Sequence, residues 1–214
     1  MKKIVVAGAG AHCKVVLDQL LSAGEYEVVG LLDRCEESEL LGVPVLGGDE
    51  LMEQLYQRGV HCGFVAIGNN AVREKVTAEM ERIGYEMVTV VSRHATVSRF
   101  AVIEAGSLIM PGAIVNACAH IGKGCILNTN CSIDHDCEVG DFVHIAPGCA
   151  VSGTTTIGMR SFLGTGARAI DRITIGHDVM LGAGAVAVSD IPDGCTAVGV
   201  PAKVIKGRTQ NNHG

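Results

Sequence analysis

The chain has 214 residues, and its 17 Lys and Arg against 23 Asp and Glu give a formal net charge of −6. This balance argues against a nucleic-acid-binding protein, which normally presents a basic face. A hydrophobic content of 48% argues against a disordered chain. The composition is rich in glycine, with 28 residues, and poor in aromatic rings, with three Tyr, four Phe and no Trp. Without large rings to fill a core, a narrow and repeated interior of Val, Ile, Leu and Ala is favoured.

No apolar run of the sequence reaches the ~20 residues of a membrane-spanning helix. The two best runs, Ile4–Ala11 and Val179–Val188, are short and contain glycine. Lys2 and Lys3 before the first run faintly resemble a signal peptide, but a strand, turn and helix explain the same residues better. The nine cysteines would suggest disulfides in a secreted protein, yet a chain of this size and apolar content does not need them. We therefore expect a cytoplasmic protein with reduced thiols and no membrane span.

The first half of the chain alternates between strand-like and helix-like segments. The expected strands are Lys3–Ala7, Tyr26–Leu32, Val43–Leu46, Cys62–Ile67 and Glu86–Val91, and the expected helices are Cys13–Leu21, Asp49–Arg58 and Val72–Ile83. Such alternation, with glycine at the strand ends, is typical of a parallel sheet. The pattern predicts a Rossmann-like α/β domain of four or five strands over residues 1–90.

A glycine-rich turn follows the first expected strand. Gly8 and Gly10 lie between strand and helix, where such a turn lets phosphate oxygens approach the N–H groups of the helix. Asp33 ends the second strand, where an acidic residue often accepts a hydrogen bond from a ribose. Cys13 replaces the third glycine of the dinucleotide pattern, which disfavours NAD. The turn favours binding of another nucleotide, with a purely structural turn as the alternative.

The second half of the chain repeats an apolar or small residue every six positions. The series is Val97, Ile103, Ile109, Val115, Ile121, Leu127, Ile133, Val139, Ile145, Val151, Ile157, Leu163, Ala169, Ile175, Leu181 and Ala187. Three hexapeptides close one triangular coil of a parallel β-helix, so residues three hexapeptides apart stack on one another. The repeat predicts a β-helix of about five coils within residues 91–214, followed by a C-terminal extension.

Four cysteines fall into a second series of the repeat, two positions before the apolar residue. Cys125, Cys131, Cys137 and Cys149 share this position with small residues such as Ala113. Their clustering suggests zinc binding as one interpretation. The spacings of 6, 6 and 12 residues fit a small inward slot better, where cysteine acts as a compact hydrophobe. We therefore expect packed, inert thiols and no metal.

One turn of the repeat carries a histidine between carboxylates. His135 and Asp136 fall two and three places after Ile133, at a corner that is expected to point outward. A carboxylate that orients the ring and stabilises the imidazolium makes a histidine a general base. A solvated surface histidine is the alternative. Asp134 is a less certain partner of the ring, and His144 is expected to face outward on the next side and to line the same cleft.

Several stretches of the chain together resemble a known family. They are the column of hexapeptides and the segments Val6–Val16, Ala66–Arg73, Leu127–Gly140 and Gly199–Lys203, which cover nearly the whole chain. The chain looks like the bacterial nucleotide-sugar acetyltransferases of the left-handed β-helix superfamily. Within it, the chain most resembles the bacillosamine-pathway UDP-4-amino-sugar N-acetyltransferases and the related sialic-acid O-acetyltransferases. The resemblance implies a left-handed β-helix and a homotrimer with active sites between subunits.

The resemblance also implies a role for each matching position. His135 corresponds to the catalytic base and Asp136 to its acidic partner, which is Glu in some relatives, so the side chain here is one methylene shorter. The nucleotide-sugar side is matched by Gly8, Gly10, His12, Asp33, Gly68, Asn69 and Asn128. The acetyl-CoA side is matched by His144, Gly164, Gly182, Gly184, Gly199, Pro201 and Lys203. No metal is implied.

The reaction implied by the resemblance is transfer of an acetyl group from acetyl-CoA to the 4-amino group of a nucleotide-activated amino-dideoxy sugar. UDP-4-amino-4,6-dideoxy-N-acetylglucosamine is the favoured acceptor. A sugar O-acetyltransferase and a non-catalytic nucleotide-sugar-binding protein remain alternatives. A γ-type carbonic anhydrase shares the β-helix, but its H-x4-H pair of metal ligands is absent, because His120, His135 and His144 are 15 and 9 residues apart.

Overall fold

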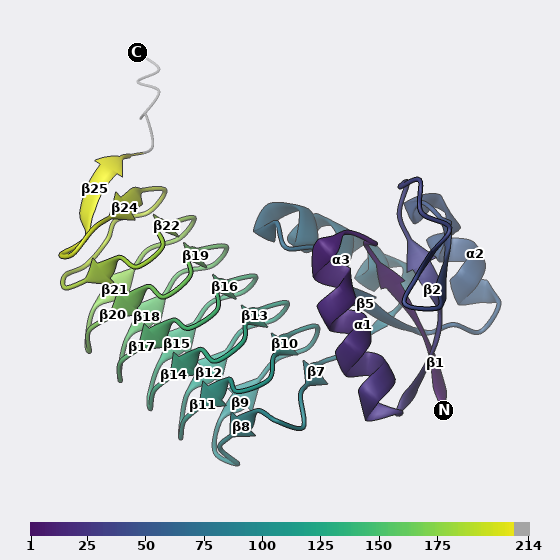
Figure 1. Ribbon diagram of the computed structural model, residues 1–214, viewed down its shortest axis with the longest axis horizontal. Coiled ribbons are helices and arrows are strands. Elements are labelled where there is room, and N and C mark those ends of the chain that lie inside the picture. The colour runs from purple at the N-terminus through teal and green to yellow at the C-terminus, as the bar shows by residue number, and fades with distance from the viewer. Residues whose placement is uncertain (208–214) are drawn as a thin grey trace.

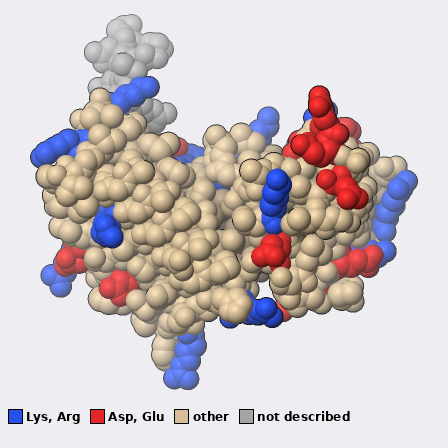
Figure 2. Space-filling model, in the orientation of Figure 1, with Lys and Arg blue, Asp and Glu red and all other residues tan. Residues whose placement is uncertain are grey.

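The computed structural model describes residues 1–207, so the end of the expected second domain, 208–214, lies outside the described residues. The chain forms two parts that lie side by side (Figure 1). An α/β sheet forms the N-terminal part, and a stack of triangular coils extends away from it to β25 (Lys203–Lys206) at the far end. On the face shown in Figure 2, charged side chains are sparse over the coils, and acidic side chains gather over the N-terminal part. No helix within residues 1–207 is long and apolar enough to cross a membrane.

The N-terminal sheet has six strands in the order β3-β4-β2-β1-β5-β6, and only the β3–β4 pair is antiparallel. Its elements are β1 (Lys2–Ala7), α1 (Ala11–Ala23), β2 (Tyr26–Leu32), β3 (Glu39–Leu40), β4 (Val43–Gly47), a 3-10 turn (Asp49–Leu51), α2 (Met52–Gln57), β5 (Cys62–Val65), α3 (Asn70–Ile83) and β6 (Glu86–Met87). The expected parallel α/β architecture is confirmed. The helices α1 and α3 begin before the expected Cys13 and Val72, and the short β3 is an element that the sequence pattern did not predict.

Both faces of this sheet are buried, which explains why β1 is apolar without interruption over residues 4–7, after two exposed lysines. Alternate side chains of β1 point to opposite faces. Ile4 and Val6 pack with α1, whereas Val5 and Ala7 pack with α2 and α3. The first of these clusters also contains Leu108 from the first coils of the β-helix. A shared hydrophobic core therefore joins the two parts.

The expected strand Glu86–Val91 is wrong as a single element. Its first half, β6, pairs with β5 of the N-terminal sheet, whereas its second half, β7 (Val90–Val91), pairs with β10 (Leu108–Ile109) of the β-helix. The backbone groups of the two halves find their hydrogen bonds in different sheets. A short apolar run carries no local feature that distinguishes the two partners.

From β7 onward, the chain forms mostly two-residue strands in three sheets, which are the eight-stranded, six-stranded and five-stranded faces of a prism (Figure 1). The eight-stranded face contains β7, β10, β13 (Ile126–Leu127), β16 (His144–Ile145), β19 (Phe162–Leu163), β22 (Met180–Leu181), β24 (Thr196–Val198) and β25. The six-stranded face contains β8 (Thr96–Val97), β11 (Ile114–Val115), β14 (Ser132–Ile133), β17 (Ala150–Val151), β20 (Arg168–Ala169) and β23 (Val186–Ala187). The five-stranded face contains β9 (Val102–Ile103), β12 (His120–Ile121), β15 (Glu138–Val139), β18 (Thr156–Ile157) and β21 (Thr174–Ile175). Pairing with a shift of 18 residues, as in Ile126 with His144, is that of the expected β-helix.

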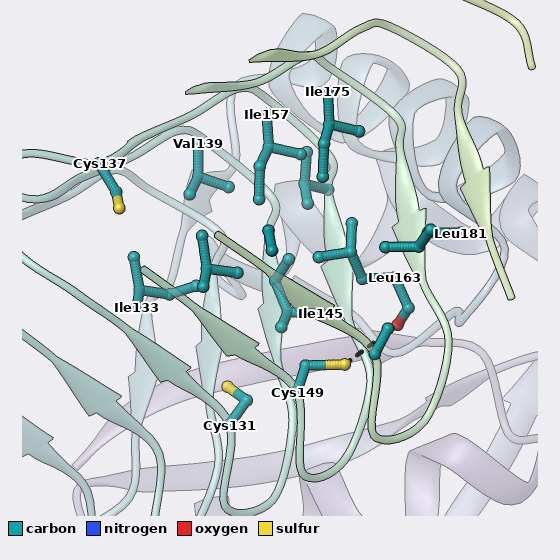
Figure 3. Packing of buried hydrophobic residues seen from close by; sticks show 14 of the residues in the cluster. Cys131, Ile133, Cys137, Val139, Ile145, Cys149, Ile157, Leu163, Ile175 and Leu181 are labelled. Atoms are coloured by element: carbon teal, nitrogen blue, oxygen red, sulfur yellow. Dashed lines mark hydrogen bonds between the residues drawn. The ribbon is translucent and has the colours of Figure 1, made fainter. Parts of the chain in front are cut away.

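The interior of the prism holds the apolar column and the small slot beside it. Ile133, Ile145 and Leu163 belong to the column, and Cys131 and Cys149 to the slot (Figure 3). The Cys149 thiol donates a hydrogen bond to the Leu163 carbonyl at 3.5 Å, and burial raises the pKa of Cys131 to about 12. Among the residues described, no three His, Cys, Asp or Glu side chains are grouped to hold a metal ion. The geometry is that of packed thiols.

Three sets of turns run along the prism as its edges. The first edge joins the eight-stranded to the six-stranded face at 110–113, 128–131, 146–149, 164–167 and 182–185. The second edge joins the six-stranded to the five-stranded face at 98–101, 116–119, 134–137, 152–155 and 170–173. The third edge returns to the eight-stranded face at 104–107, 122–125, 140–143, 158–161 and 176–179.

Candidate functional site

The carboxyl ends of β1, β2 and β5 meet at one edge of the N-terminal sheet, where ligands of such sheets bind. Gly8 follows β1 with φ +99°, and a Cβ there would come within 2.9 Å of Ile67 Cγ1 and 3.2 Å of Ala66 O. Glycine is required here because the backbone is left-handed and the space is filled. Gly10 is the N-cap of α1 and provides no side-chain partner for the first N–H groups of the helix.

Asp33 supports the glycine turn from the end of β2. Its Oδ2 accepts a hydrogen bond from the Ala9 N–H and its Oδ1 accepts one from the Arg34 N–H, both at 2.7 Å. Each carboxylate oxygen retains lone-pair capacity for a ligand hydroxyl. A cavity of about 420 Å³ lies beside the turn, and its lining includes Gly8, Asp33, Asp49, Ile67, Val72 and Val76. The size and polarity of this cavity suit part of a nucleotide.

Gly68 and Asn69 lead from β5 into α3. Asn69 is the N-cap, and its Oδ1 accepts a hydrogen bond from the Val72 N–H at 3.0 Å. A second cavity, of about 370 Å³, lies between this helix end and the β-helix, where Gly68 and Asn69 face Phe162 and Met180. Five of the expected nucleotide-sugar residues, Gly8, Gly10, Asp33, Gly68 and Asn69, thus lie along one edge of the sheet.

His144 in β16 points outward from the prism, as expected, but the N-terminal domain covers it. It is 9% exposed and lies against His12, so within one chain the expectation that it lies beside His135 is wrong. Its ring meets Phe162 edge-on with centroids 5.0 Å apart, and the His12 ring lies at 6.1 Å. Asn128 Nδ2 lies 3.3 Å from His144 Nε2. The N-terminal domain covers this part of the eight-stranded face, which the repeat itself does not indicate.

Burial keeps both of these histidines neutral. Burial, followed by the positive charge of Arg73, lowers the pKa of His144 to about 4, and the same two causes lower the pKa of His12. His144 Nδ1 and His12 Nε2 are buried and have no hydrogen-bond partner within the described part of the chain. Buried polar atoms normally have a partner. These two nitrogens are therefore candidates for contact with a bound substrate.

We expect acidification to destabilise the protein through His144, because its pKa of about 4 in the folded chain lies below the unfolded value of 6.5. This stability is complete above the unfolded value and is lost as the pH falls, by about 3 kcal/mol at pH 4. Urea unfolding at neutral pH and at pH 4 measures the loss. A His144→Gln variant should lose about 3 kcal/mol less than the wild type on acidification. Equal losses in the two proteins would contradict a buried, neutral His144.

His135 and Asp136 lie exposed at the second edge. Asp136 has φ +56°, and its Oδ2 is 2.8 Å from His135 Nδ1. The hydrogen bond to Asp136, and next the charge of Asp134, raise the pKa of His135 above its usual 6.5. The His135 ring lies over the next coil, where a Cβ on Gly153 would come within 2.7 Å of its Cε1. Glycine therefore leaves the room that the ring occupies.

Asp134 supports the backbone of this turn. Its Oδ1 accepts hydrogen bonds from the His135 N–H at 2.8 Å and from Asn116 Nδ2 at 2.9 Å. The ring nitrogen that Asp136 does not hold, His135 Nε2, has no partner among the described residues. The turn therefore presents an oriented imidazole with one free nitrogen, which is the arrangement of a general base.

The first edge carries several of the residues expected on the acetyl-CoA side. Gly164, Gly182 and Gly184 lie along this edge, as does the substrate-side Asn128. Gly199 and Pro201 lie in the turn between β24 and β25, and Lys203 is the first residue of β25. A Cβ on Gly164 would come within 2.6 Å of Ala183 N, and one on Gly182 within 2.7 Å of Val198 Cγ1. Successive coils therefore approach closely here, and the edge presents backbone with few bulky side chains.

Within one chain, these groups lie on different sides of the prism. Asn128 is in a first-edge turn and His135 is in a second-edge turn, with β14 of the six-stranded face between them. The structure brings His12, Asn128 and His144 together, but it keeps His135 and Asp136 apart from them. Each chain thus carries the expected base at one border of its six-stranded face, and several of the residues expected on the acetyl-CoA side at the opposite border.

Arg73 in α3 is a buried residue to which sequence reasoning gives no role. Its side chain is 1% exposed, and it donates hydrogen bonds to the carbonyl oxygens of Gly124 at 2.7 Å and Phe142 at 2.8 Å. A charged residue on a helix is ordinarily expected at the surface. The sequence marks Arg73 only as part of Ala66–Arg73, one of the stretches that resemble the acetyltransferase family. That resemblance does not indicate what the side chain contacts.

Comparison with known proteins finds relatives of both parts. Residues 3–80 match the family model of the PglD N-terminal domain. GDP-perosamine N-acetyltransferase of Escherichia coli O157:H7 is 31% identical over 168 residues, which are 76% of this chain and 75% of that protein. PerB from Caulobacter crescentus, solved with CoA and GDP-perosamine, matches with a TM-score of 0.92 and 40% identity over 97% of this chain and 98% of that chain. The acetyltransferase domain of PglB from Neisseria gonorrhoeae, solved with acetyl coenzyme A, has the same TM-score of 0.92 and 40% identity over 95% and 99% of the two chains.

A parallel α/β domain in front of a left-handed β-helix, with an oriented histidine on one edge, defines an acyltransferase of the hexapeptide-repeat class. The chain belongs to the nucleotide-sugar acetyltransferase family and is an acetyltransferase.

Proposed function

We propose that this protein transfers the acetyl group of acetyl-CoA to the 4-amino group of a nucleotide-linked amino-dideoxy sugar. The observation that carries the proposal is the exposed His135, whose Nδ1 lies 2.8 Å from Asp136 Oδ2 and whose Nε2 is open to a substrate proton. Relatives named for N-acetylation of GDP-perosamine support an amine acceptor over a hydroxyl. An amine is also the better nucleophile and needs less help from the base.

The reaction requires one proton to be moved away from the attacking amine. The nitrogen forms a bond to the thioester carbonyl, its proton passes to His135 Nε2, and the carbon–sulfur bond breaks. The thiolate of coenzyme A then takes the proton from the imidazolium. Asp136 stabilises the imidazolium between these two steps. Binding both substrates together supplies much of the remaining rate through positioning.

The nucleotide sugar is placed at the carboxyl edge of the N-terminal sheet in this proposal. Asp33 is positioned to accept hydrogen bonds from a ribose, and the N-termini of α1 and α3, capped by Gly10 and Asn69, favour phosphate groups. His12 and Asn128 face the sugar. Coenzyme A runs along the first edge, past the glycines and toward Lys203, with His144 near the acetyl group.

We further propose a homotrimer with its active sites between subunits. The second edge carries His135, the first edge carries Asn128, and the six-stranded face separates them within one chain. In the proposed ring, the second edge of one subunit would face the first edge of the next, through a heterologous interface that closes after three subunits. One site then combines the base of one chain with the residues of its neighbour that bind acetyl-CoA.

Two inactive variants should complement each other if the site is shared. His135→Ala and Asn128→Ala subunits, co-expressed and co-purified, should form mixed trimers in which about a quarter of the interfaces carry both intact residues. The mixed protein is expected to recover measurable acetyl transfer, whereas each variant alone lacks it. A mixed trimer as inactive as either variant would contradict sites built from two chains.

Two nucleotides are candidates for the acceptor. The resemblance favours a UDP-linked sugar, and the relatives named above favour a GDP-linked one. The lining of the cavity beside Asp33 also includes Asp49, which offers a second carboxylate to a base. A carboxylate can accept two adjacent N–H groups of guanine, whereas uracil offers a single ring N–H between two carbonyls. This carboxylate favours including GDP-perosamine in the first experiment.

The experiment is a thiol-release assay with acetyl-CoA and a panel of acceptors. UDP-4-amino-4,6-dideoxy-N-acetylglucosamine and GDP-perosamine test the two nucleotides, and sialic acid tests O-acetylation. Turnover with a 4-amino sugar supports the proposal, and the ratio of kcat/KM values identifies the nucleotide. Turnover with sialic acid alone would replace it with O-acetylation. Binding of nucleotide sugars without turnover would indicate a non-catalytic binding protein.

A further inference from the structure

We propose that Asn70, Arg73 and Glu74, at the beginning of α3, form a clamp that fixes the position of the N-terminal domain along the axis of the β-helix. Arg73 is the central positioning residue of this clamp. The catalytic consequence rests on the proposed function, because the clamp sets where a nucleotide-bound sugar meets the reacting groups. The structural part rests on the contacts alone.

Arg73 joins the end of β5 to two successive coils. Its Nε donates to the carbonyl oxygen of Gly124 at 2.7 Å, and its Nη2 donates to that of Phe142 at 2.8 Å. Its Nη1 donates to the carbonyl oxygens of Ile67 at 3.0 Å and Gly68 at 3.2 Å. The planar, branched guanidinium can reach all four oxygens at once, which a lysine ammonium on a flexible stem cannot reproduce. The loop that contains Gly68 is thereby tied to the third edge.

Asn70 extends the clamp to a third coil. Its Oδ1 accepts a hydrogen bond from Arg73 Nη2 at 2.9 Å, and its Nδ2 donates to the carbonyl oxygen of Arg160 at 2.8 Å. Gly124, Phe142 and Arg160 occupy equivalent positions of successive third-edge turns, with φ values of +62°, +57° and +58°. The two side chains therefore engage three steps of one ladder of carbonyl groups. This set of contacts fixes a single position of α3 along the axis of the prism.

Glu74 adds an ion pair on the outer side of the same contact. Its Oε2 lies 3.3 Å from Arg160 Nη1, and Arg160 Nε lies 2.7 Å from Asp178 Oδ1 in the next coil. Arg160 is thus held by α3 on one side and by the following turn of the third edge on the other. The clamp spans four turns of this edge.

The charge of Arg73 has a consequence beyond the contact itself. Within residues 1–207, its hydrogen bonds go to carbonyl and amide oxygens, and none goes to a carboxylate. A buried cation without a counterion is costly, so a contact that served packing alone would be better made by an apolar or neutral side chain. Burial is the main cause that lowers the pKa of both His12 and His144, and the positive charge of Arg73 lowers both further. The clamp therefore places two neutral imidazoles where the domains meet.

The test compares Arg73→Met, which removes charge and donors, with Arg73→Lys, which keeps the charge but loses the branched geometry. In Arg73→Met, kcat should fall about 10- to 100-fold through misplacement of the sugar, whereas the KM for acetyl-CoA should not change. The His144 pKa, followed by NMR of the ring protons, should rise in Arg73→Met, where burial still holds it below the ordinary value, and should stay at the wild-type value in Arg73→Lys. Arg82→Met is the matched control, because Arg82 is exposed on α3 and paired with Glu79. It should change neither quantity.

A folded Arg73→Met protein with wild-type kcat and an unchanged His144 pKa would overturn the proposal. If this variant fails to fold, Asn70→Ala tests the same clamp with Arg73 still present. Faster amide hydrogen exchange along the third edge and a lower kcat are then expected, and wild-type values of both would overturn the proposal. Exchange rates and the His144 pKa need no turnover. Absence of acetyl transfer in the wild type would therefore refute the proposed function without obscuring the result for the clamp.

Discussion

Replacing His135 with alanine is expected to lower kcat for acetyl transfer by about 10²–10⁴-fold, which is the usual contribution of a general base. His135 is exposed at the second edge, so its loss removes no core contact. The melting temperature and the KM for acetyl-CoA should therefore remain near the wild-type values. Thiol release at saturating concentrations of both substrates measures the effect.

His120 provides the matched control for this substitution. It is also a histidine of the β-helix held by carboxylates, but Glu138 occupies its Nδ1 at 3.0 Å and Glu104 occupies its Nε2 at 2.9 Å. With both ring nitrogens engaged, His120 has no free position for a substrate proton. His120→Ala should keep the wild-type kcat. A His135→Ala enzyme with full activity would show that the base is another group.

The pH dependence of the reaction gives a second view of the same residue. Asp136, followed by Asp134, raises the pKa of His135 above 6.5, so the ring becomes neutral at a higher pH than an isolated histidine. A general base acts in its neutral form. The wild-type kcat should therefore rise with pH through this pKa. Asp136→Asn removes the larger cause of the shift and should move the rising limb to lower pH.

Replacing Ile157 with alanine is expected to destabilise the protein by about 2–5 kcal/mol. Ile157 lies in β18 at an inner position of the prism and is 1% exposed. The substitution removes buried apolar surface and leaves a cavity between coils that cannot move together, because backbone hydrogen bonds set their spacing. Urea unfolding followed by circular dichroism, at one fixed protein concentration, measures the change.

Ile205 is the matched surface residue for this comparison. It lies in β25 and is 66% exposed, so Ile205→Ala should change the free energy of unfolding by no more than about 0.5 kcal/mol. The contrast between two identical substitutions isolates burial from side-chain chemistry. Similar losses at the two positions would show that the inner column does not dominate the stability of the β-helix.

The β-helix could be predicted from the sequence because its rule is local. Every inward position must fit a narrow prism, so the series from Val97 to Ala187 repeats without interruption, and the slot beside it holds mostly small residues such as Cys131. Most of the N-terminal strands and helices were predictable for a similar reason, since residues 4–7 of β1 and residues 64–67 at and just after the end of β5 are apolar and lead into Gly8 and Gly68. In both cases, neighbours along the chain determine the pattern of burial.

The contacts between the two parts could not be predicted in the same way. His144 occupies an outward position of the repeat, and the N-terminal domain buries it against His12. Arg73 lies on a helix with charged neighbours, yet its side chain is buried among carbonyl groups of distant turns. Both outcomes depend on how two separately encoded surfaces meet. The spacing of residues within the N-terminal domain or within the β-helix does not indicate how the two surfaces pack together.

In the β-helix, the position of a residue within the 18-residue period determines the face or edge on which it lies. Insertion of a whole coil would lengthen the molecule and leave every later residue on its own edge. Insertion of one hexapeptide would keep the apolar column intact, yet it would rotate every later residue by one face. Gly164 and Gly182 would then leave the first edge while the fold itself remained sound. Changes in length during evolution should therefore come in complete coils, or be confined to outward loops that leave the 18-residue register of the following coils unchanged.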